Sequence, residues 1–425
     1  MSGLRNQPSK SNRERSWIKL LLNNRALGQL WIGVTISTIG DFITWIALTW
    51  FVTEQTSDGA AVGLMLLIWA LPAVVTAPII GRLMDRYPLR AFLIVDNILR
   101  CVLIAALPIL SIMNLLSLPL LYLIGGLCGA LAPATRVGVG LIIPRVVPNR
   151  RLAAINIAFA ISEQVAGLLG PIAAALSVGY FGAIQALWID VGSFAFIAVL
   201  MAILPPSFVL LPKVKPNIVS NTDKIRFKMH PSIIVLTGLS GLFWFAYGPT
   251  EAALPLYVKG TFNGDVRHMS YLFMAVGFGS LFGSGVAMKM AKWKRTGLTL
   301  ASIMCLWGVI QVLFTLSSIY ILAWIIWFVA GFVWGPYLPL KATFVQRRTP
   351  VEHLGRVLGI QQAYLAPMMP LGAALGGFLM RYLTPTHVIM VSGLLCVVGA
   401  LTAIIPPWLR DKDPDNTFGE VGSNL

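Results

Sequence analysis

The sequence predicts an all-α membrane protein with twelve transmembrane helices in two pseudo-symmetric halves of six. Hydrophobic residues make up 57% of the 425 residues, and charged residues make up only 11%. Apolar runs of about 20 residues, the length that crosses a bilayer as a helix, recur from one end of the chain to the other. A basic, polar segment between Pro205 and Pro231 divides these runs into two groups of six.

Twelve apolar runs are long enough to be spans. In order, they cover approximately residues 26–52, 60–80, 91–113, 118–143, 154–178, 184–204, 232–258, 269–290, 297–317, 319–341, 357–380 and 386–406. The expected domains are an N-terminal tail, a first half, a linker, a second half and a C-terminal tail, at residues 1–25, 26–204, 205–231, 232–406 and 407–425.

The basic residues predict which side of the membrane each connection faces. With the N-terminus in the cytoplasm, 26 of the 32 Lys and Arg lie in the tails and the even-numbered connections. This asymmetry follows the positive-inside rule, so both termini are expected in the cytoplasm. Because it also explains the net charge of +16, no nucleic-acid partner is expected.

A short internal repeat supports two related halves. The segment Arg145–Leu152, after the fourth span, is similar to Arg347–Leu354, after the tenth, and Pro148 precedes Pro350 by 202 residues. Parallel halves around a site at the membrane midplane are one known layout of secondary transporters.

Five acidic residues fall inside the expected spans: Asp41, Asp96, Glu163, Asp190 and Glu251. A carboxylate at the centre of a span costs about 2.5–3.5 kcal/mol, so an acid kept there is expected to be functional. Burial disfavours the ionised form, which lets a proton gradient load and unload the group. We expect Asp41 first, then Glu163 and Glu251, and also Asp190, to carry protons or contact substrate, whereas Asp96 is expected to be structural.

The alternative is that each acid is a hydrogen-bonded structural group or one half of a salt bridge. Three basic residues lie inside the expected spans and are the candidate partners: Arg100, Arg136 and Lys341. Arg136 is also a candidate for proton or substrate duty.

Aromatic and polar residues share helix faces with two of these acids. Thr38 and Trp45 lie three and four residues from Asp41, and Trp244 and Tyr247 lie on the face of Glu251. With Asn156 in the fifth span, these side chains are expected to line the substrate cavity. Aromatic walls with one acid suit an amphipathic or cationic substrate.

The connection after the second span reads GRLMDRYPLR from Gly81 to Arg90. It resembles the G-x-L-x-D-R-x-G-R-R signature of the major facilitator superfamily, with Pro88 in place of the second glycine and Leu89 in place of the first of the paired arginines. The resemblance implies a gating latch formed by Gly81, Asp85, Arg86 and Arg90. Membrane anchoring alone would explain the arginines but not Asp85. The equivalent connection of the second half, Lys289–Arg295, contains no acid, so the halves are unequal there.

The fifth span contains Gly167, Gly170 and Pro171, and Asn156 and Glu163 share one helix face with the two glycines. This run resembles the glycine-proline element of antiporters in the same superfamily. The resemblance implies an antiporter-like role, and the alternative is a simple proline kink.

Ile39–Asp41 with Trp45, Pro144–Arg145 and Gly355–Val357 together resemble the drug-exporting branch, which includes macrolide efflux proteins and enterobactin-type siderophore exporters. The resemblance implies a bacterial plasma-membrane transporter that exports small drug-, macrolide- or siderophore-like molecules in exchange for protons by alternating access. A proton-coupled importer, or a flippase for lysophospholipid-like molecules, would use the same architecture.

Other classes of protein fit the sequence less well. The four histidines have no metal-ligand spacing, no G-x-S-x-G nucleophile motif is present, and no phosphate-binding G-x-x-x-x-G-K-S/T loop occurs. We therefore expect no enzyme, no cofactor, no metal and no use of ATP. The expected partners are a small amphipathic substrate, protons and the lipid bilayer, and the protein is expected to act as a monomer.

Overall fold

The computed structural model describes residues 21, 24–147, 149–205, 229–290, 293, 295–405 and 407–409, and the regular structure within them is helical. The first seven helices are α2 (Arg25–Thr56), α3 (Gly59–Arg86), α4 (Leu89–Ile112), α5 (Leu118–Leu131), α6 (Pro133–Val146), α7 (Asn149–Phe181) and α8 (Leu187–Ile203). They are followed by α10 (Pro231–Phe262), α11 (Val266–Met290), α12 (Thr296–Thr315), α13 (Tyr320–Trp334), α14 (Tyr337–Arg348), α15 (Val351–Leu365), α16 (Met368–Leu379), α17 (Pro385–Ile404) and the short η1 (Pro407–Leu409).

These helices confirm the expected membrane fold. Within the described ranges, ten helical segments are long and apolar enough to cross a membrane, with α5–α6 and α13–α14 each forming one segment. The shorter apolar helix α8 and the pair α15–α16 occupy the positions of the sixth and eleventh expected spans. The twelve spans expected from hydrophobic length therefore each have a helical counterpart.

Three of the spans are divided into two helices, each time at a proline, whereas Pro108 and Pro171 lie inside undivided helices. The divisions fall at Pro133, Pro336 and Pro367. Proline has no backbone N–H and its ring clashes with the preceding turn, so it interrupts the helical hydrogen bonds. Pro133 and Pro336 divide the fourth and the tenth of the expected spans and lie 203 residues apart, close to the offset of the sequence repeat.

The chain forms two compact units. One comprises Met1–Ala47 and Val75–Pro216, and the other comprises Leu48–Val74 and Asn217–Leu425. Parts of α2 and α3 thus belong to each unit, and the halves expected at residues 26–204 and 232–406 stay a prediction.

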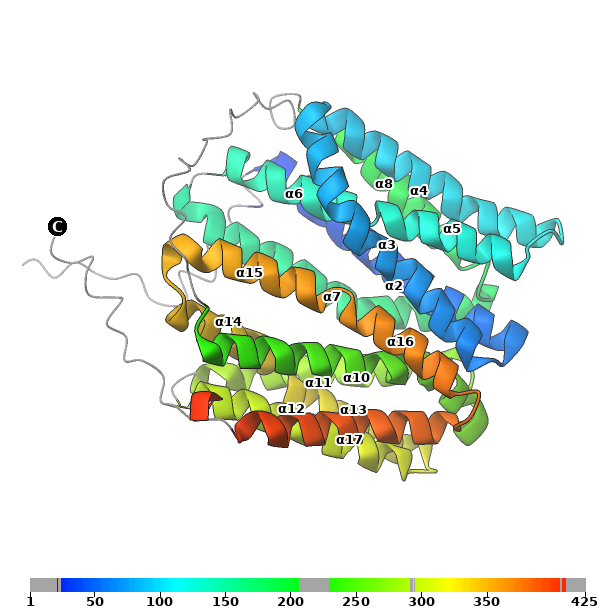
Figure 1. Ribbon diagram of the computed structural model, residues 1–425. Helices are drawn as coiled ribbons and strands as arrows, with labels where there is room; N and C mark the ends of the chain where they lie inside the picture. Colours follow the sequence, from blue (N-terminus) through cyan, green and yellow to red (C-terminus); the bar gives the residue numbers. More distant parts are fainter. Residues whose placement is uncertain are drawn as a thin grey trace, which may run out of the picture. The chain divides into compact units, whose positions relative to one another are not determined.

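The core of the first unit is built by helices packed around α4. In this unit α4 contacts α8, α5 and α6, and α4, α5 and α8 are seen side by side in Figure 1. Leu30, Leu93, Ile142, Ile155 and Ile197 belong to one buried cluster. Because lipid tails are as apolar as these side chains, close van der Waals packing stabilises such contacts rather than removal from water.

The second unit contains two helices whose glycines face one another. Gly279 and Gly283 of α11 form one G-x-x-x-G motif, and Gly331 and Gly335 at the end of α13 form another. A Cβ atom on any of the four would overlap a carbonyl oxygen of the facing helix. The Ser284 hydroxyl also donates a hydrogen bond to the Gly335 carbonyl, at 3.2 Å. Glycine is required here because the two backbones are in contact.

Glycines also place the start of α3 against α16 in the second unit. A Cβ atom on Gly63 would lie 2.9 Å from the Cα atom of Gly377. The same unit packs α10 against α16 and α17, and α12 against α17 (Figure 1). The contact between Gly63 and Gly377 explains why residues 48–74 group with the second unit.

A short connection joins α10 to α11. Asn263 has φ of 48° and ends α10 in the left-handed conformation. The Asp265 carboxylate then accepts the backbone N–H of Arg267 at 2.9 Å and contacts the His268 ring nitrogen at 2.8 Å. Partial burial opposes ionisation, but hydrogen bonds from His268 and Arg267 lower the pKa of Asp265. Asp265 is thereby stabilised as an anion at the start of α11, where the helix dipole favours a negative charge.

The contact between α11 and α13 predicts a specific loss of stability. Gly279→Ala should destabilise the protein by about 1–3 kcal/mol, because the added methyl group forces two backbones apart. Gly285→Ala is the matched control, since nothing lies within 4 Å of a Cβ atom there. Thermal unfolding in detergent should show a lower midpoint for Gly279→Ala only. Equal midpoints for the two variants would contradict the close packing.

Candidate functional site

The first unit contains a partly buried ion pair between α2 and α4. The Arg100 guanidinium lies 2.6 Å from the Asp41 carboxylate, and the exposed fractions of the two side chains are 2% and 38%. The Arg100 guanidinium also lies over the Phe194 ring of α8, 4.1 Å from its centroid. A planar guanidinium stacks favourably on an aromatic face.

Asp190 of α8 lies beside this pair and is fully buried. Its carboxylate accepts hydrogen bonds from the Thr44 hydroxyl at 2.5 Å and from the Ser193 hydroxyl at 2.8 Å. A Cβ atom on Gly40 would overlap the Asp190 carboxylate, so α2 needs glycine at this position. Gly40 and Asp41 are adjacent in the sequence and have different roles. Gly40 leaves space for the Asp190 carboxylate, and Asp41 forms the ion pair with Arg100.

Asp96 is the third acid of the group and precedes Arg100 by one turn of α4. It is buried, and neither of its carboxyl oxygens has a hydrogen-bond partner in the described structure. Asp41, Asp96 and Asp190 all interact electrostatically with Arg100. We call these four residues the Arg100 cluster. Three carboxyl groups therefore share one guanidinium in a place where unbalanced charge is costly.

A second ion pair in this unit is exposed. Arg136 of α6 and Glu163 of α7 are 3.0 Å apart, and both side chains are exposed. On the sequence alone, a salt bridge is the alternative to a transport role for each acid. The structure shows such a salt bridge for both Glu163 and Asp41. On the same helix, a Cβ atom on Gly170 would lie 2.5 Å from Cβ of Phe42, so the Gly167–Pro171 run packs against the residue after Asp41.

The second unit also contains a buried acid, Glu251 of α10. Tyr247, one turn earlier, is hydrogen-bonded to its carboxyl group, whereas the Oε2 atom has no partner among the described atoms. The neighbouring Thr250 accepts a hydrogen bond from the Gln311 amide, and Gln311 accepts one from the Trp307 indole at 3.1 Å. These bonds connect α10 to α12 beside Glu251.

Aromatic side chains from four helices gather near Glu251. The aromatic cluster consists of Phe243, Trp244, Tyr247, Trp307, Trp334 and Tyr337. Phe243 stacks on Trp334 with ring centroids 3.9 Å apart, and Trp334 stacks on Tyr337 at 4.3 Å. The Tyr337 hydroxyl is anchored by Ser240 at 2.8 Å. Trp244, Tyr247 and Trp334 are only partly buried, so parts of their rings remain accessible.

Other predicted cavity residues have local roles or are not described. The Thr38 hydroxyl donates to the Val34 carbonyl of its own helix, at 2.8 Å. Trp45 is half-buried and packs edge-on against Phe42, with ring centroids 6.3 Å apart. The side chain of Asn156 lies outside the described residues.

The predicted latch lies where α3 ends and α4 begins. Asp85 and Arg86 are exposed in the last turn of α3, and Gly81 lies one turn earlier. The Arg90 guanidinium donates to the Ala202 carbonyl at the end of α8. The gating role of these four residues stays a prediction.

Sequence reasoning missed Trp307, Trp334 and Tyr337. In the sequence, only the three-residue spacing of Trp334 and Tyr337 around Gly335-Pro336 suggests that these two aromatic residues are neighbours. This spacing does not show that α10 packs beside them. Within the described ranges, no group of three His, Cys, Asp or Glu side chains could hold a metal ion. The arrangement provides titratable groups in one unit and an aromatic surface with an acid in the other.

Comparison with known proteins identifies the family. A family model for the Major Facilitator Superfamily matches residues 30–368 and 233–421. The multidrug efflux pump Tap of Mycolicibacterium fortuitum is 24% identical over 398 residues, which cover 88% of this chain and 94% of Tap. Macrolide efflux protein A of Streptococcus pyogenes is 24% identical over 399 residues, which cover 90% and 95% of the two chains.

Solved structures of the same fold also align with the chain. The nucleoside transporter NupG aligns with a TM-score of 0.68 and 14% identity, covering 88% of this chain and 99% of NupG. A bacterial homologue of the iron transporter ferroportin aligns with a TM-score of 0.69 and 14% identity, covering 90% and 99%. These alignments agree with the helical fold, in which ten segments of the described residues are long and apolar enough to cross a membrane. The family match shows that the chain belongs to the Major Facilitator Superfamily and is a secondary transporter, not an enzyme.

Proposed function

We propose that the protein is a proton-coupled exporter of small amphipathic, drug-like molecules, acting by alternating access in the plasma membrane. Export is supported by relatives that are named as a multidrug efflux pump and a macrolide efflux protein. The concentration of Lys and Arg in the tails and even-numbered connections supports cytoplasmic termini.

The observation that carries proton coupling is the charge imbalance of the Arg100 cluster. Fully ionised, Asp41, Asp96 and Asp190 would supply three negative charges against the one positive charge of Arg100. Such an excess is unfavourable in a low-dielectric interior, and protonation of carboxyl groups removes it. A transported proton therefore has a natural binding place in this cluster.

Asp41 is the proposed site of proton entry because its side chain is partly exposed while Arg100 and Asp190 are buried. Protonation of Asp41 weakens its attraction to Arg100 and leaves the guanidinium to interact with Asp190 and Asp96. The balance of contacts among α2, α4 and α8 then depends on the proton, as coupling of protonation to a conformational equilibrium requires.

The aromatic cluster with Glu251 is the proposed substrate surface. Partly exposed rings of Trp244 and Trp334 offer flat apolar faces, and Glu251 supplies one carboxyl group next to Tyr247. A flat amphipathic molecule with a positive charge would satisfy both the rings and the acid.

The signature residues Gly81, Asp85, Arg86 and Arg90 are the proposed gate. Asp85 places a negative charge in the last turn of α3, where the helix dipole disfavours it. A cationic group or a helix N-terminus would therefore stabilise Asp85 in one of the two transport conformations. Packing of the Gly167–Pro171 run on Phe42 supports an antiporter-like role for this run next to Asp41. The Arg136–Glu163 pair interacts electrostatically with Asp41, which supports a role in the same site.

The direction and coupling of transport can be tested in everted membrane vesicles that are acidic inside. We expect a fluorescent amphipathic dye to accumulate inside while protons leave. A pH difference of one unit supplies about 1.4 kcal/mol per proton, which supports roughly tenfold accumulation. Dye accumulation only in right-side-out vesicles acidified outside would instead identify an importer. Dye uptake without proton movement would contradict proton coupling.

Asp41→Asn should abolish dye accumulation driven by the pH gradient, because the amide cannot release a proton. Exchange of dye across proteoliposomes without a gradient should continue, since Asp96 and Asp190 remain to balance Arg100. Both rates are measured in the same vesicles.

Asp58→Asn is the matched control for Asp41→Asn. It makes the same chemical change at an exposed position, where the carboxylate accepts the Ala60 N–H at 2.9 Å, and asparagine can keep this cap. Asp41→Glu should restore part of the gradient-driven transport. Wild-type accumulation by Asp41→Asn would exclude Asp41 as the coupling site.

Glu251→Gln should weaken binding of the aromatic cation ethidium by about tenfold, because the substitution removes the acid beside an aromatic surface. Binding of a neutral aromatic compound of similar size should change little. Glu54→Gln is the control, since Glu54 is exposed and accepts a hydrogen bond from Trp50 at 2.6 Å. Fluorescence titration of the purified variants measures both affinities, and equal losses for the cation and the neutral compound would contradict the role of Glu251.

A further inference from the structure

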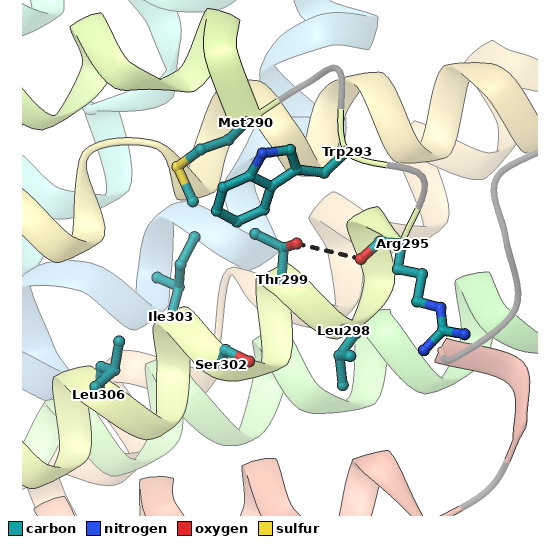
Figure 2. A pocket seen from close by; sticks show the side chains of 8 residues that line it. All are labelled: Met290, Trp293, Arg295, Leu298, Thr299, Ser302, Ile303 and Leu306. Carbon is teal, nitrogen blue, oxygen red and sulfur yellow. Dashed lines mark hydrogen bonds between the residues drawn. The ribbon is translucent and has the colours of Figure 1, made fainter.

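A hollow lies on the second unit, where α11 ends and α12 begins. It is an open groove of about 640 Å³. The lining residues are Met290, Trp293, Arg295, Leu298, Thr299, Ser302, Ile303 and Leu306 (Figure 2). None of these residues belongs to the aromatic cluster or the Arg100 cluster, so the proposed transport mechanism leaves the groove without a role.

The groove has one polar end and a long apolar body. Figure 2 shows the Trp293 indole beside Met290 and over Thr299, with Arg295 at the start of α12 and Leu306 at the far end. Both Trp293 and Arg295 are exposed. Tryptophan and arginine are the residues that anchor proteins at the boundary between lipid headgroups and hydrocarbon.

The apolar body continues along the surface of α12. Leu306, Val309, Leu313 and Leu316 are all exposed and recur every three or four residues, so they form one helix face. From Arg295 to Leu306 the helix rises roughly 16 Å, close to half the roughly 30 Å of the hydrocarbon core. The groove therefore has the length of one acyl chain in a single leaflet.

The charge at the polar end is positive and has no acid nearby in the sequence. Arg295 ends a run that also contains Lys289, Lys292 and Lys294, and no acid occurs between Asp265 and Glu352. A positive end on an apolar groove is complementary to a negatively charged headgroup on an acyl chain. Clusters of basic residues beside transmembrane helices bind anionic lipids in this way.

We propose that this groove binds one anionic phospholipid, with its phosphate at Arg295 and an acyl chain along Ser302 and Leu306. The headgroup contact provides the preference for negative charge, and Trp293 covers the glycerol region. The bound lipid fills a surface hollow that protein side chains leave open between α11 and α12.

Native mass spectrometry of the full-length protein in detergent tests this proposal. The protein is mixed with equal amounts of phosphatidylglycerol and phosphatidylcholine that carry identical chains. We expect phosphatidylglycerol to be retained preferentially, and Arg295→Gln to reduce its retention about fivefold, the effect of losing one cation near a headgroup. Ser302→Phe should reduce retention of both lipids because the ring fills the groove.

Arg381→Gln is the matched control, because Arg381 is an exposed arginine of the same unit at the end of α16, over the Phe378 ring. It should retain lipid like the wild type, and thermal unfolding should confirm that all three variants are folded. The proposal is overturned if Arg295→Gln or Ser302→Phe retains lipid like the wild type, or if Arg381→Gln loses as much. It is also overturned if glycerol phosphate at the lipid's concentration displaces phosphatidylglycerol, since the site would then bind a free anion without a chain.

Discussion

The pairing of Arg100 with carboxyl groups is the interaction on which the first unit depends. A guanidinium cannot lose its proton, so an arginine buried within a transmembrane helix must find negative charge inside the protein. Asp41 supplies that charge from α2, and Phe194 of α8 stacks on the remaining face. Arg100 of α4 thus contacts both α2 and α8 and helps to hold the three helices together.

The same constraint explains residues that carry no charge. Asp190 can approach α2 only because Gly40 has no side chain, and Thr44 and Ser193 satisfy the oxygen atoms of that buried carboxylate. Glycine and hydroxyl residues near a buried acid are therefore part of its electrostatic environment. Replacing them with larger or apolar residues would alter the charge balance without touching an ionisable group.

Much of the fold could be predicted from the sequence, because apolar length acts locally. The twelve expected spans follow from the requirement that lipid-exposed backbone be hydrogen-bonded. The divisions at Pro133 and Pro336 were not predicted, since prolines such as Pro108 and Pro171 lie inside undivided helices. The Tyr247–Glu251 contact was also predictable, since the two residues are one helical turn apart. Helical periodicity determines which residues share a face.

Contacts between helices were less predictable. The sequence left three basic partners open for Asp41, and only packing of α2 on α4 selects Arg100. Trp334 joins the aromatic cluster because α13 ends beside α10, which no spacing within one helix reveals. The grouping of residues 48–74 with the second unit likewise depends on backbone contact at Gly63 and Gly377.

The interruptions at Pro133 and Pro336 have a mechanical consequence. At each of them, the span consists of two short helices, α5 and α6 or α13 and α14, instead of one continuous helix. A continuous helix tilts along its whole length, whereas in a helix with a kink one segment can move while the other stays packed. The fourth and tenth spans can therefore bend at a proline, and motion near one surface of the membrane need not disturb side chains held at the opposite surface.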